Sequence, residues 1–186
     1  MGAIATSRMT AREFLELPED PREIHRELVD GETVVSPSPS FNHAVAAGKL
    51  MRIIGNYTDA HNLGEIASDV DNPVSKFTVR RPDLFYFSAA RLHLAKGKAI
   101  SGAPDLCVEF ISPSSIHTDR VEKFAEYAAF GVVNYWIFDP LARTAEAFVL
   151  KAGRYTPTAS GSGDQTVRFP PFMELDIPLG RLWWSD

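Results

Sequence analysis

Apolar residues recur at helical spacing in two long segments of this chain. Between residues 42 and 60 they repeat every three or four positions, which predicts a first long helix that packs against a sheet. A second long helix is predicted to begin at Ser112 or Ser115 and to end at Gly131, since serine suits an N-cap and glycine a C-cap. The residues of its predicted apolar stripe are Val121, Phe124, Ala125, Ala128 and Ala129.

Strands are predicted where apolar residues run continuously or alternate with polar ones. The predicted core strands lie near residues 65–70, 83–87, 105–111 and 132–138. Before them, Asp30-Gly31 suits the tight turn of a hairpin that spans residues 27–35. After them come three short antiparallel strands near residues 145–150, 154–157 and 166–169, with a Ser-Gly linker from Ser160 to Gly163. This order of elements indicates a mixed α/β fold.

The composition is typical of one globular domain. The 186 residues are 45% hydrophobic, so we expect a single domain over residues 1–186, with residues 1–8 disordered. The net charge of -5 argues against a broad basic surface for nucleic acid, because nonspecific affinity needs many Lys and Arg contacts. The single cysteine, Cys107, cannot form an intrachain disulfide, and neither a membrane span nor a secretory signal is evident. We therefore expect a cytoplasmic protein with no membrane partner.

Two carboxylates lie where only apolar side chains are expected. Asp83 directly precedes the apolar run from Leu84 to Phe87, and Glu109 lies inside the run from Leu106 to Ile111. Burying an unpaired carboxylate costs several kcal/mol, which is on the order of the stability of a whole domain. A positive partner is therefore expected nearby, either a metal ion or Lys123.

These carboxylates belong to motifs that resemble a known family. The motifs are Arg81-Pro82-Asp83, the segment from Pro104 to Pro113, the segment from Lys123 to Tyr127, and the strand end Tyr135-Trp136-Ile137-Phe138-Asp139-Pro140. They resemble the Uma-type family of restriction-endonuclease-like proteins in the PD-(D/E)XK nuclease superfamily, and the resemblance covers most of the chain. It implies a restriction-endonuclease-like core, in which two long helices flank a central mixed sheet and β-hairpins are added at the N- and C-terminal ends.

The resemblance also implies roles for individual residues. Asp83 would be the acid of the first motif, and Glu109 the acid of the second. The superfamily pattern places a lysine two residues after that second acid, where this chain has Ile111. The resemblance implies that the lysine has moved to the following helix, at Lys123.

The chemistry of phosphodiester hydrolysis gives the same three residues a task. Hydrolysis needs an activated water, neutralised phosphoryl oxygens and a stabilised leaving oxygen, and Mg²⁺ or Mn²⁺ held by one or two carboxylates can serve all three. Asp83 and Glu109 are the expected metal ligands. Lys123 would orient or deprotonate the water and offset phosphate charge, with its pKa lowered by partial burial near cations.

Two further acids are candidates for supporting roles. Asp105 lies on the same side of its predicted strand as Glu109, where it either joins the metal site or caps the entry to the strand, and we favour the cap. Glu27 matches a recurrent acid of the family. It either completes the metal shell or is an exposed hairpin acid that pairs with Arg26 or another surface base.

His43 and Tyr127 complete the set of candidate site residues. His43 either contacts phosphate or shuttles a proton, but near the start of a helix the commoner role is a cap or a surface residue. Tyr127 shares a side of the second helix with Lys123, between its acidic surface and its apolar stripe. A lysine on that side can point toward a buried site.

The three main residues also have purely structural alternatives. Lys123 lies four residues after Asp119 and three before Glu126, a spacing that by itself gives ordinary ion pairs on a helix surface. Asp83 alternatively makes an Asx-type hydrogen bond at the start of its strand. Glu109, in the middle of an apolar strand, has the least convincing structural alternative.

Two functions account for these features. The leading hypothesis is a Mg²⁺- or Mn²⁺-dependent endonuclease whose partner is nucleic acid, with DNA as the expected substrate. The rival is a non-catalytic module of the same fold that binds protein or nucleic acid, as a homodimer joined through Trp183 and Trp184. The acidic net charge and Ile111 at the lysine position favour the rival. A metal-dependent hydrolase of another phosphoester would use the same site chemistry.

Overall fold

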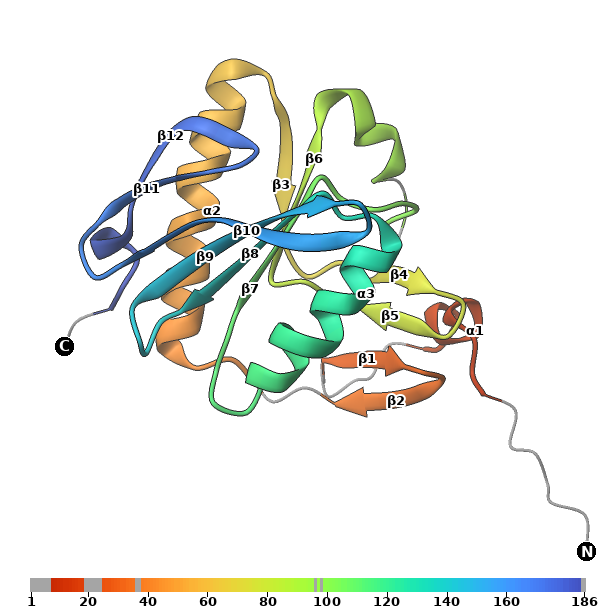
Figure 1. Cartoon of the computed structure of the whole chain (residues 1–186). Helices are drawn as coiled ribbons and strands as arrows, with labels where there is room; N and C mark the ends of the chain where they lie inside the picture. Colours follow the sequence, from red (N-terminus) through yellow and green to blue (C-terminus); the bar gives the residue numbers. More distant parts are fainter. Residues whose placement is uncertain (1–7, 19–24, 36–37, 96, 98, 185–186) are drawn as a thin grey trace, which may run out of the picture.

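A six-stranded mixed sheet forms the centre of the computed structural model, which describes residues 8–18, 25–35, 38–95, 97 and 99–184 (Figure 1). The strand order is β10-β9-β8-β7-β6-β3. The strands are β3 (Gly64–Ala67), β6 (Leu84–Ser88), β7 (Leu106–Phe110), β8 (Asn134–Asp139), β9 (Thr144–Lys151) and β10 (Arg154–Ser162). Strands β7 and β8 pair in parallel, and the other four pairs are antiparallel. The predicted mixed α/β fold is therefore confirmed.

Two helices cover opposite faces of this sheet. Helix α2 (Phe41–His61) buries an apolar stripe that includes Leu50 and Ile54. Helix α3 (Lys123–Phe130), preceded by the π-helical segment η2 (Thr118–Glu122), lies over the other face. Because side chains alternate along a strand, β7 turns Leu106, Val108 and Phe110 toward α2 and turns Cys107 and Glu109 toward α3.

A separate four-stranded antiparallel sheet lies alongside α3 (Figure 1). Its strands, in the order β2-β1-β5-β4, are β1 (Arg26–Val29), β2 (Glu32–Val35), β4 (Asn72–Ser75) and β5 (Thr78–Arg80). Asp30 and Gly31 have φ values of 53° and 87°, so the predicted tight turn is confirmed. Helix α1 (Ala11–Leu15) packs on this sheet through Phe14, Leu28 and Val79.

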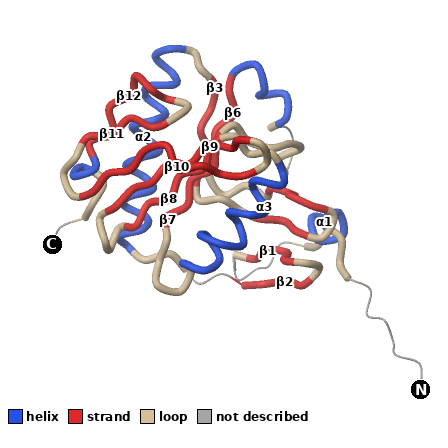
Figure 2. Tube along the Cα trace, viewed as in Figure 1, coloured by secondary structure: helices blue, strands red, loops and turns tan. Residues whose placement is uncertain are grey.

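A two-stranded hairpin completes the core on the α2 side (Figure 2). It consists of β11 (Thr166–Phe169) and β12 (Phe172–Pro178). Phe169 and Phe172 from this hairpin surround the indole of Trp136 on β8. Two short 3₁₀ segments, η1 (Ala89–Leu94) and η3 (Leu179–Arg181), lie after β6 and β12.

Two details differ from the sequence-based expectations. Ser160 to Ser162 form part of β10, where they pair with β9, rather than a linker. Val121, Ala125 and Ala129 of the predicted apolar stripe are exposed, and the buried side chains on this helical segment include Lys123. The reason is that the sheet face beneath α3 carries a carboxylate, which a charged partner stabilises and an apolar one does not.

Predictions made for the two ends of the chain can also be compared with the structure. Residues 1–7 of the segment predicted to be disordered lie outside the described residues, and Arg8 pairs with Asp30. Trp183, expected at a dimer edge, is only 5% exposed and donates its indole N–H to the carbonyl of Gly163. No helix in the described ranges is both long and apolar enough to cross a membrane.

Candidate functional site

Glu109 is the buried carboxylate at the centre of the site. Its position in the middle of β7 leaves it 1% exposed, on the face that α3 covers. Lys123 Nζ lies 3.0 Å from its Oε2 atom, and the hydroxyl of Tyr127 donates to its Oε1 atom at 2.9 Å. Because Lys123 and Tyr127 are one helical turn apart on α3, a single helix holds both oxygens of Glu109.

Lys123 lies among several carboxylates. Its Nζ atom is 3.2 Å from Asp119 Oδ1 and 3.9 Å from Glu27 Oε1, in addition to its contact with Glu109. The spacing of Asp119 and Lys123 had suggested an ordinary surface ion pair, but Asp119 is 3% and Lys123 7% exposed. We refer to Glu27, Asp83, Glu109, Asp119 and Lys123 as the Lys123 cluster.

The pKa of Lys123 shifts in the direction opposite to our expectation. Burial is the largest influence and lowers this pKa, but the charges of Glu109, Glu27, Asp119 and Asp83 together raise it above its ordinary value. The neighbours of Lys123 are anions rather than the cations we expected. Lys123 therefore keeps its proton at neutral pH and cannot readily accept one from water.

Asp83 lies beside Glu109 at the end of the sheet. Leu84 is paired with Val108 in the antiparallel register of β6 and β7, so continuing this register by one residue places Asp83 opposite Glu109. The backbone N–H of Phe110 donates to Asp83 Oδ2 at 2.7 Å. This hydrogen bond joins two strands and is not the local Asx-type bond that was the structural alternative. The structure therefore brings the two predicted metal ligands together.

His43 approaches the same carboxylate from α2. Its Nε2 atom is 3.2 Å from Asp83 Oδ1, and its ring packs on Phe110 with centroids 5.5 Å apart. Burial lowers the pKa of His43, but the hydrogen bond and charge of Asp83 outweigh it, and the pKa is raised above its ordinary value. The cap of α2 is Ser40 rather than His43, and His43 instead contacts the predicted metal ligand Asp83.

The acids of the Lys123 cluster experience competing influences. Burial raises the pKa of Glu109 well above its usual range, although the charge of Lys123 opposes it. Burial likewise raises the pKa of Asp119 against the effect of Lys123. Several negative groups thus share one ammonium in a region with little water. Strongly perturbed acids that face one another are typical of functional sites.

Arg80 forms a second buried ionic centre, which the sequence analysis did not identify. It is 1% exposed and contacts Glu27 at 3.0 Å, Glu126 at 2.6 Å and Glu122 at 3.2 Å. Glu27 is itself only 6% exposed and accepts the backbone N–H of Arg81 at 2.8 Å. Glu27 is therefore a buried link between the two cations, so of its two alternatives the exposed acid paired with Arg26 was wrong.

Asp105 lies outside the Lys123 cluster. It is at the other end of β7, where Arg91 Nη1 is 2.5 Å from its Oδ1 atom and the backbone N–H of Ser88 donates to its Oδ2 atom at 2.8 Å. These contacts tie the start of β7 to the end of β6. Asp105 therefore has the structural role that we favoured.

The donors at the site are compatible with Mg²⁺. Within the described ranges, no group of three or more His, Cys, Asp or Glu side chains is arranged to hold a metal ion. Mg²⁺, however, commonly takes only one or two protein carboxylates and keeps several waters. Asp83 and Glu109 supply two adjacent carboxylates, and the charge of Asp83 helps to raise the pKa of Glu109. A cation next to both would relieve this repulsion.

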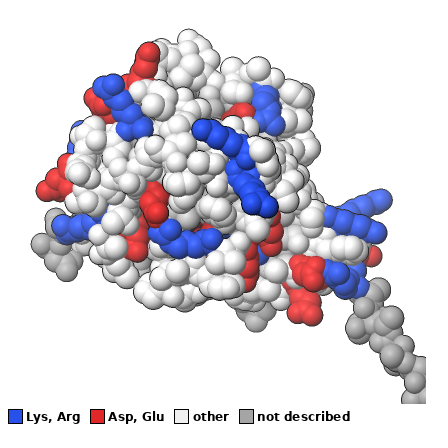
Figure 3. Space-filling model, viewed as in Figure 1, with Lys and Arg blue, Asp and Glu red and all other residues white. Residues whose placement is uncertain are grey.

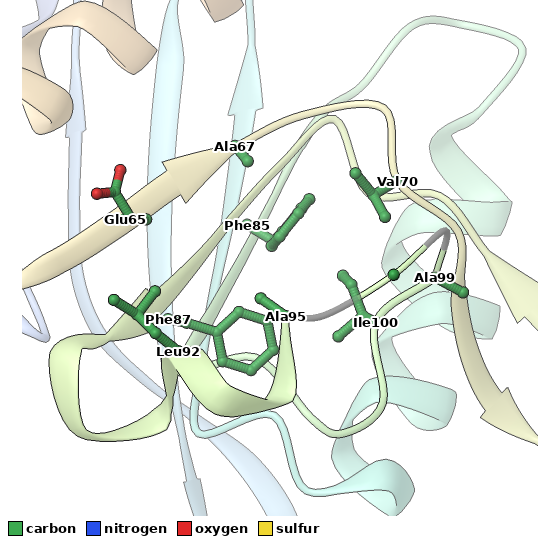
Figure 4. Close-up of a pocket in the computed structure, with 10 residues that line it drawn as sticks. Glu65, Ala67, Val70, Phe85, Phe87, Leu92, Ala95, Ala99 and Ile100 are labelled. Atoms are coloured by element: carbon green, nitrogen blue, oxygen red, sulfur yellow. The ribbon is translucent and has the colours of Figure 1, made fainter.

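A cavity of about 150 Å³ lies elsewhere, between β3, β6 and η1 (Figure 4). Its walls are mainly apolar and include Phe85, Phe87 and Ile100, with Glu65 as the one ionisable side chain among its described lining residues. None of the Lys123 cluster lines it. The cavity therefore offers no second acid or base, and the candidate chemistry stays at the end of β7.

Comparisons with known proteins identify the family and the fold of the chain. The model of the family described as "Uma2: Putative restriction endonuclease" matches residues 11–180. The chain is similar to a crystal structure described as a putative nuclease belonging to DUF820 from Anabaena variabilis, with 21% identity, a TM-score of 0.75, and coverage of 94% of this chain and 97% of that one. No curated protein matches the sequence. Since the family model covers most of the sequence, the chain belongs to the Uma2 family.

Proposed function

We propose that this protein is a metal-dependent endonuclease that hydrolyses phosphodiester bonds of nucleic acid, with DNA as the first substrate to test. The observation that carries the proposal is the buried Glu109, held by Lys123 and Tyr127 and placed beside Asp83. A buried carboxylate beside a second, partly exposed one is costly to fold even with one lysine, so a chemical role accounts for this arrangement better than a structural one does. Family membership supports the same activity.

Asp83 and Glu109 would hold Mg²⁺ or Mn²⁺. When bound, such an ion lowers the pKa of a water ligand and neutralises phosphoryl charge. The other residues orient these two acids: Lys123 and Tyr127 hold Glu109, while the Phe110 N–H and His43 hold Asp83. Because its raised pKa keeps Lys123 protonated, we assign it to charge stabilisation rather than to removal of a proton from water.

The decisive experiment is a cleavage assay with single-stranded, duplex and branched DNA and RNA in the presence of Mg²⁺ or Mn²⁺. Wild-type protein is compared with Glu109→Gln and Asp83→Asn, which remove the charge with little change in shape. We expect each substitution to lower the cleavage rate by about 100-fold or more, as expected when a group that stabilises the transition state is lost. A chelator should abolish cleavage, and Mn²⁺ binding measured by calorimetry should weaken in both variants.

Asp105→Asn is the matched control for these substitutions. It removes a carboxylate from the residue at the other end of the same strand, where Asp105 pairs with Arg91. We expect this variant to lose stability and to keep its activity per folded molecule. Cleavage that persists in Glu109→Gln, or that is insensitive to the chelator, would contradict the proposed site.

A non-catalytic binding module is the second candidate function. One observation favours it: Lys123 already supplies a positive charge among the carboxylates. The homodimer expected for such a module is tested by light scattering, although the burial of Trp183 removes it from any dimer edge. No cleavage of any substrate, together with no metal binding in calorimetry, would establish this candidate over the nuclease.

A further inference from the structure

Two exposed aromatic rings lie together at the N-terminal end of α2. Phe41 is 64% and Trp184 43% exposed, and their rings pack edge to face with centroids 5.1 Å apart. In the described part of the chain, no other Phe, Tyr or Trp side chain falls in the exposed class. These two rings therefore present apolar faces to solvent at one place on the surface.

This aromatic pair lies at the same end of α2 as His43. Phe41 precedes His43 by two residues, so their Cα atoms are about 5 Å apart but their side chains point to opposite sides of the helix. His43 in turn lies 3.2 Å from Asp83. A strand bound at Phe41 would therefore have to pass around the start of α2 to reach the carboxylates.

Two cationic side chains, Lys49 and Arg181, belong to the surroundings of the rings. Lys49 Nζ lies 3.4 Å from the carbonyl oxygen of Trp183, and the exposed Arg181 precedes Trp184 by three residues. On the face shown in Figure 3, cationic and anionic side chains are interspersed rather than gathered by sign. The whole chain has a net charge of -5. Such a surface attracts a phosphate or two but does not provide the long basic track that a duplex backbone uses.

We propose that an unpaired base of a single-stranded nucleic acid stacks on the ring of Phe41 and meets the perpendicular ring of Trp184 edge-on, with Lys49 and Arg181 beside the phosphates of the strand. Bases of a single strand present their faces to aromatic side chains, whereas those of a duplex are already stacked on one another. A phosphodiester further along the same strand would then reach Asp83 and Glu109 around the start of α2. The cleavage of that bond rests on the proposed nuclease function, but the stacking is a binding property that is measured without cleavage.

Binding in a chelator tests the proposal. Labelled single-stranded DNA, single-stranded RNA and duplex DNA of one sequence are titrated with wild-type protein, Phe41→Ala and Phe41→Leu, and anisotropy gives the affinities. Quenching of the exposed Trp184 reports contact at the site, because Trp136 and Trp183 are 0% and 5% exposed. We expect a single strand of DNA or RNA to bind more tightly than the duplex and to quench this fluorescence. Phe41→Ala should weaken binding by about tenfold, as is typical for loss of one stacking ring.

Two controls sharpen this test. Phe41→Leu keeps apolar bulk but removes the aromatic face, so it should bind as weakly as Phe41→Ala. Met173→Ala truncates another apolar side chain, 56% exposed on β12, and should bind like wild type. Unchanged affinity in Phe41→Ala, wild-type affinity in Phe41→Leu, or preference for the duplex would each overturn the proposal. Stacking without cleavage in Mg²⁺ would overturn the nuclease function alone.

Discussion

The helices on the two faces of the six-stranded sheet contact it through different chemistry. On one face, α2 packs Leu50 and Ile54 against the apolar side chains of β7 that include Val108, and all three are fully buried. On the other face, Lys123 and Asp119 lie against Glu109 of the same strand. One strand therefore supports an apolar interface and an ionic one, separated only by the alternation of its side chains.

This difference shows how stability and chemistry are divided in the molecule. Apolar burial on the α2 face stabilises the fold without any requirement for exact pairing. The ionic face is tolerated only because each buried carboxylate has a donor, such as Tyr127 or Lys123 for Glu109. Hydrophobic residues of similar volume would often be at least as stabilising at these positions. The polar face of β7 is thus better explained by a function than by the needs of folding.

Removal of the ammonium group of Lys123 should reduce the stability of the protein most strongly. In Lys123→Met, the carboxylates of Glu109 and Asp119 stay buried without their ammonium. We expect the free energy of unfolding, measured with urea, to fall by about 3–5 kcal/mol, as for other buried pairs that lose one partner. Adding Glu109→Gln to this variant should restore part of the loss. A loss below about 1 kcal/mol would mean that the cluster is effectively solvated.

Truncation of an apolar side chain tests how much the packing of α2 on the sheet contributes to stability. Leu50→Ala leaves a cavity among fully buried neighbours of α2 and should cost about 2–5 kcal/mol in the same urea experiment. Unlike the loss in Lys123→Met, this loss should not be reduced by Glu109→Gln, because Leu50 lies on the opposite face. Partial rescue of Leu50→Ala by Glu109→Gln would show that the two faces are coupled.

Tyr127→Phe removes one hydrogen bond and leaves the ion pair in place. The hydroxyl of Tyr127 donates to Glu109 Oε1 at 2.9 Å, so its loss leaves that oxygen without this donor. We expect destabilisation of about 1–3 kcal/mol, which is less than for Lys123→Met. Tyr155→Phe on β10 is a suitable control, since Tyr155 donates to the carbonyl of Val132 rather than to a carboxylate. An equal loss of stability in both variants would show that the hydrogen bond to Glu109 contributes no more than the hydrogen bond to a backbone carbonyl.

Alkaline titration should distinguish the tyrosines that lie under α3. Burial raises the pKa of Tyr135 and of Tyr155 above the usual value in the folded state. Their contribution to stability is therefore complete below pH ~10, the ordinary pKa of tyrosine, and decreases as the pH rises above it. Tyrosinate absorbance at these residues should appear together with unfolding. Absorbance from both residues near pH 10 in folded protein would contradict their burial.

The smallest effect is expected on the outer side of the same helical segment. Val121 is 54% exposed, so Val121→Ala should change the free energy of unfolding by no more than about 0.5 kcal/mol. The apolar stripe predicted from the sequence would require a much larger loss. This variant therefore tests directly whether the buried face of the segment is the one that carries Lys123.

Local patterns along the chain were sufficient for most of the fold. The first long helix, the hairpin with Asp30-Gly31 and the strand that contains Glu109 all follow from signals within a few neighbouring residues. Strands β4 and β5, by contrast, were not predicted. They are four and three residues long, and β4 contains Pro73, so their pairing depends on partners elsewhere in the chain.

The sequence by itself determined that Asp83, Glu109 and Lys123 were the residues to examine. An acid within an apolar strand has a desolvation cost that any fold must offset, and this requirement is visible without coordinates. The family motifs pointed to the same positions. The sequence alone could not determine that Arg80 is buried among Glu27, Glu122 and Glu126, because these acids are more than 40 positions away from Arg80 along the chain.

The charge state and the neighbours of Lys123 depend on the tertiary structure and could not be obtained from the sequence. Its sequence neighbours allow either an exposed ion pair or a buried one, and the two choices shift its pKa differently. The choice is made by packing: the segment from Asp119 to Tyr127 covers the face of β7 that carries Glu109, so its polar side is buried and Val121 faces water. Helical periodicity shows which residues share a side of a helix. The surface that packs against the helix, here the face of β7 with Glu109, determines which side is buried.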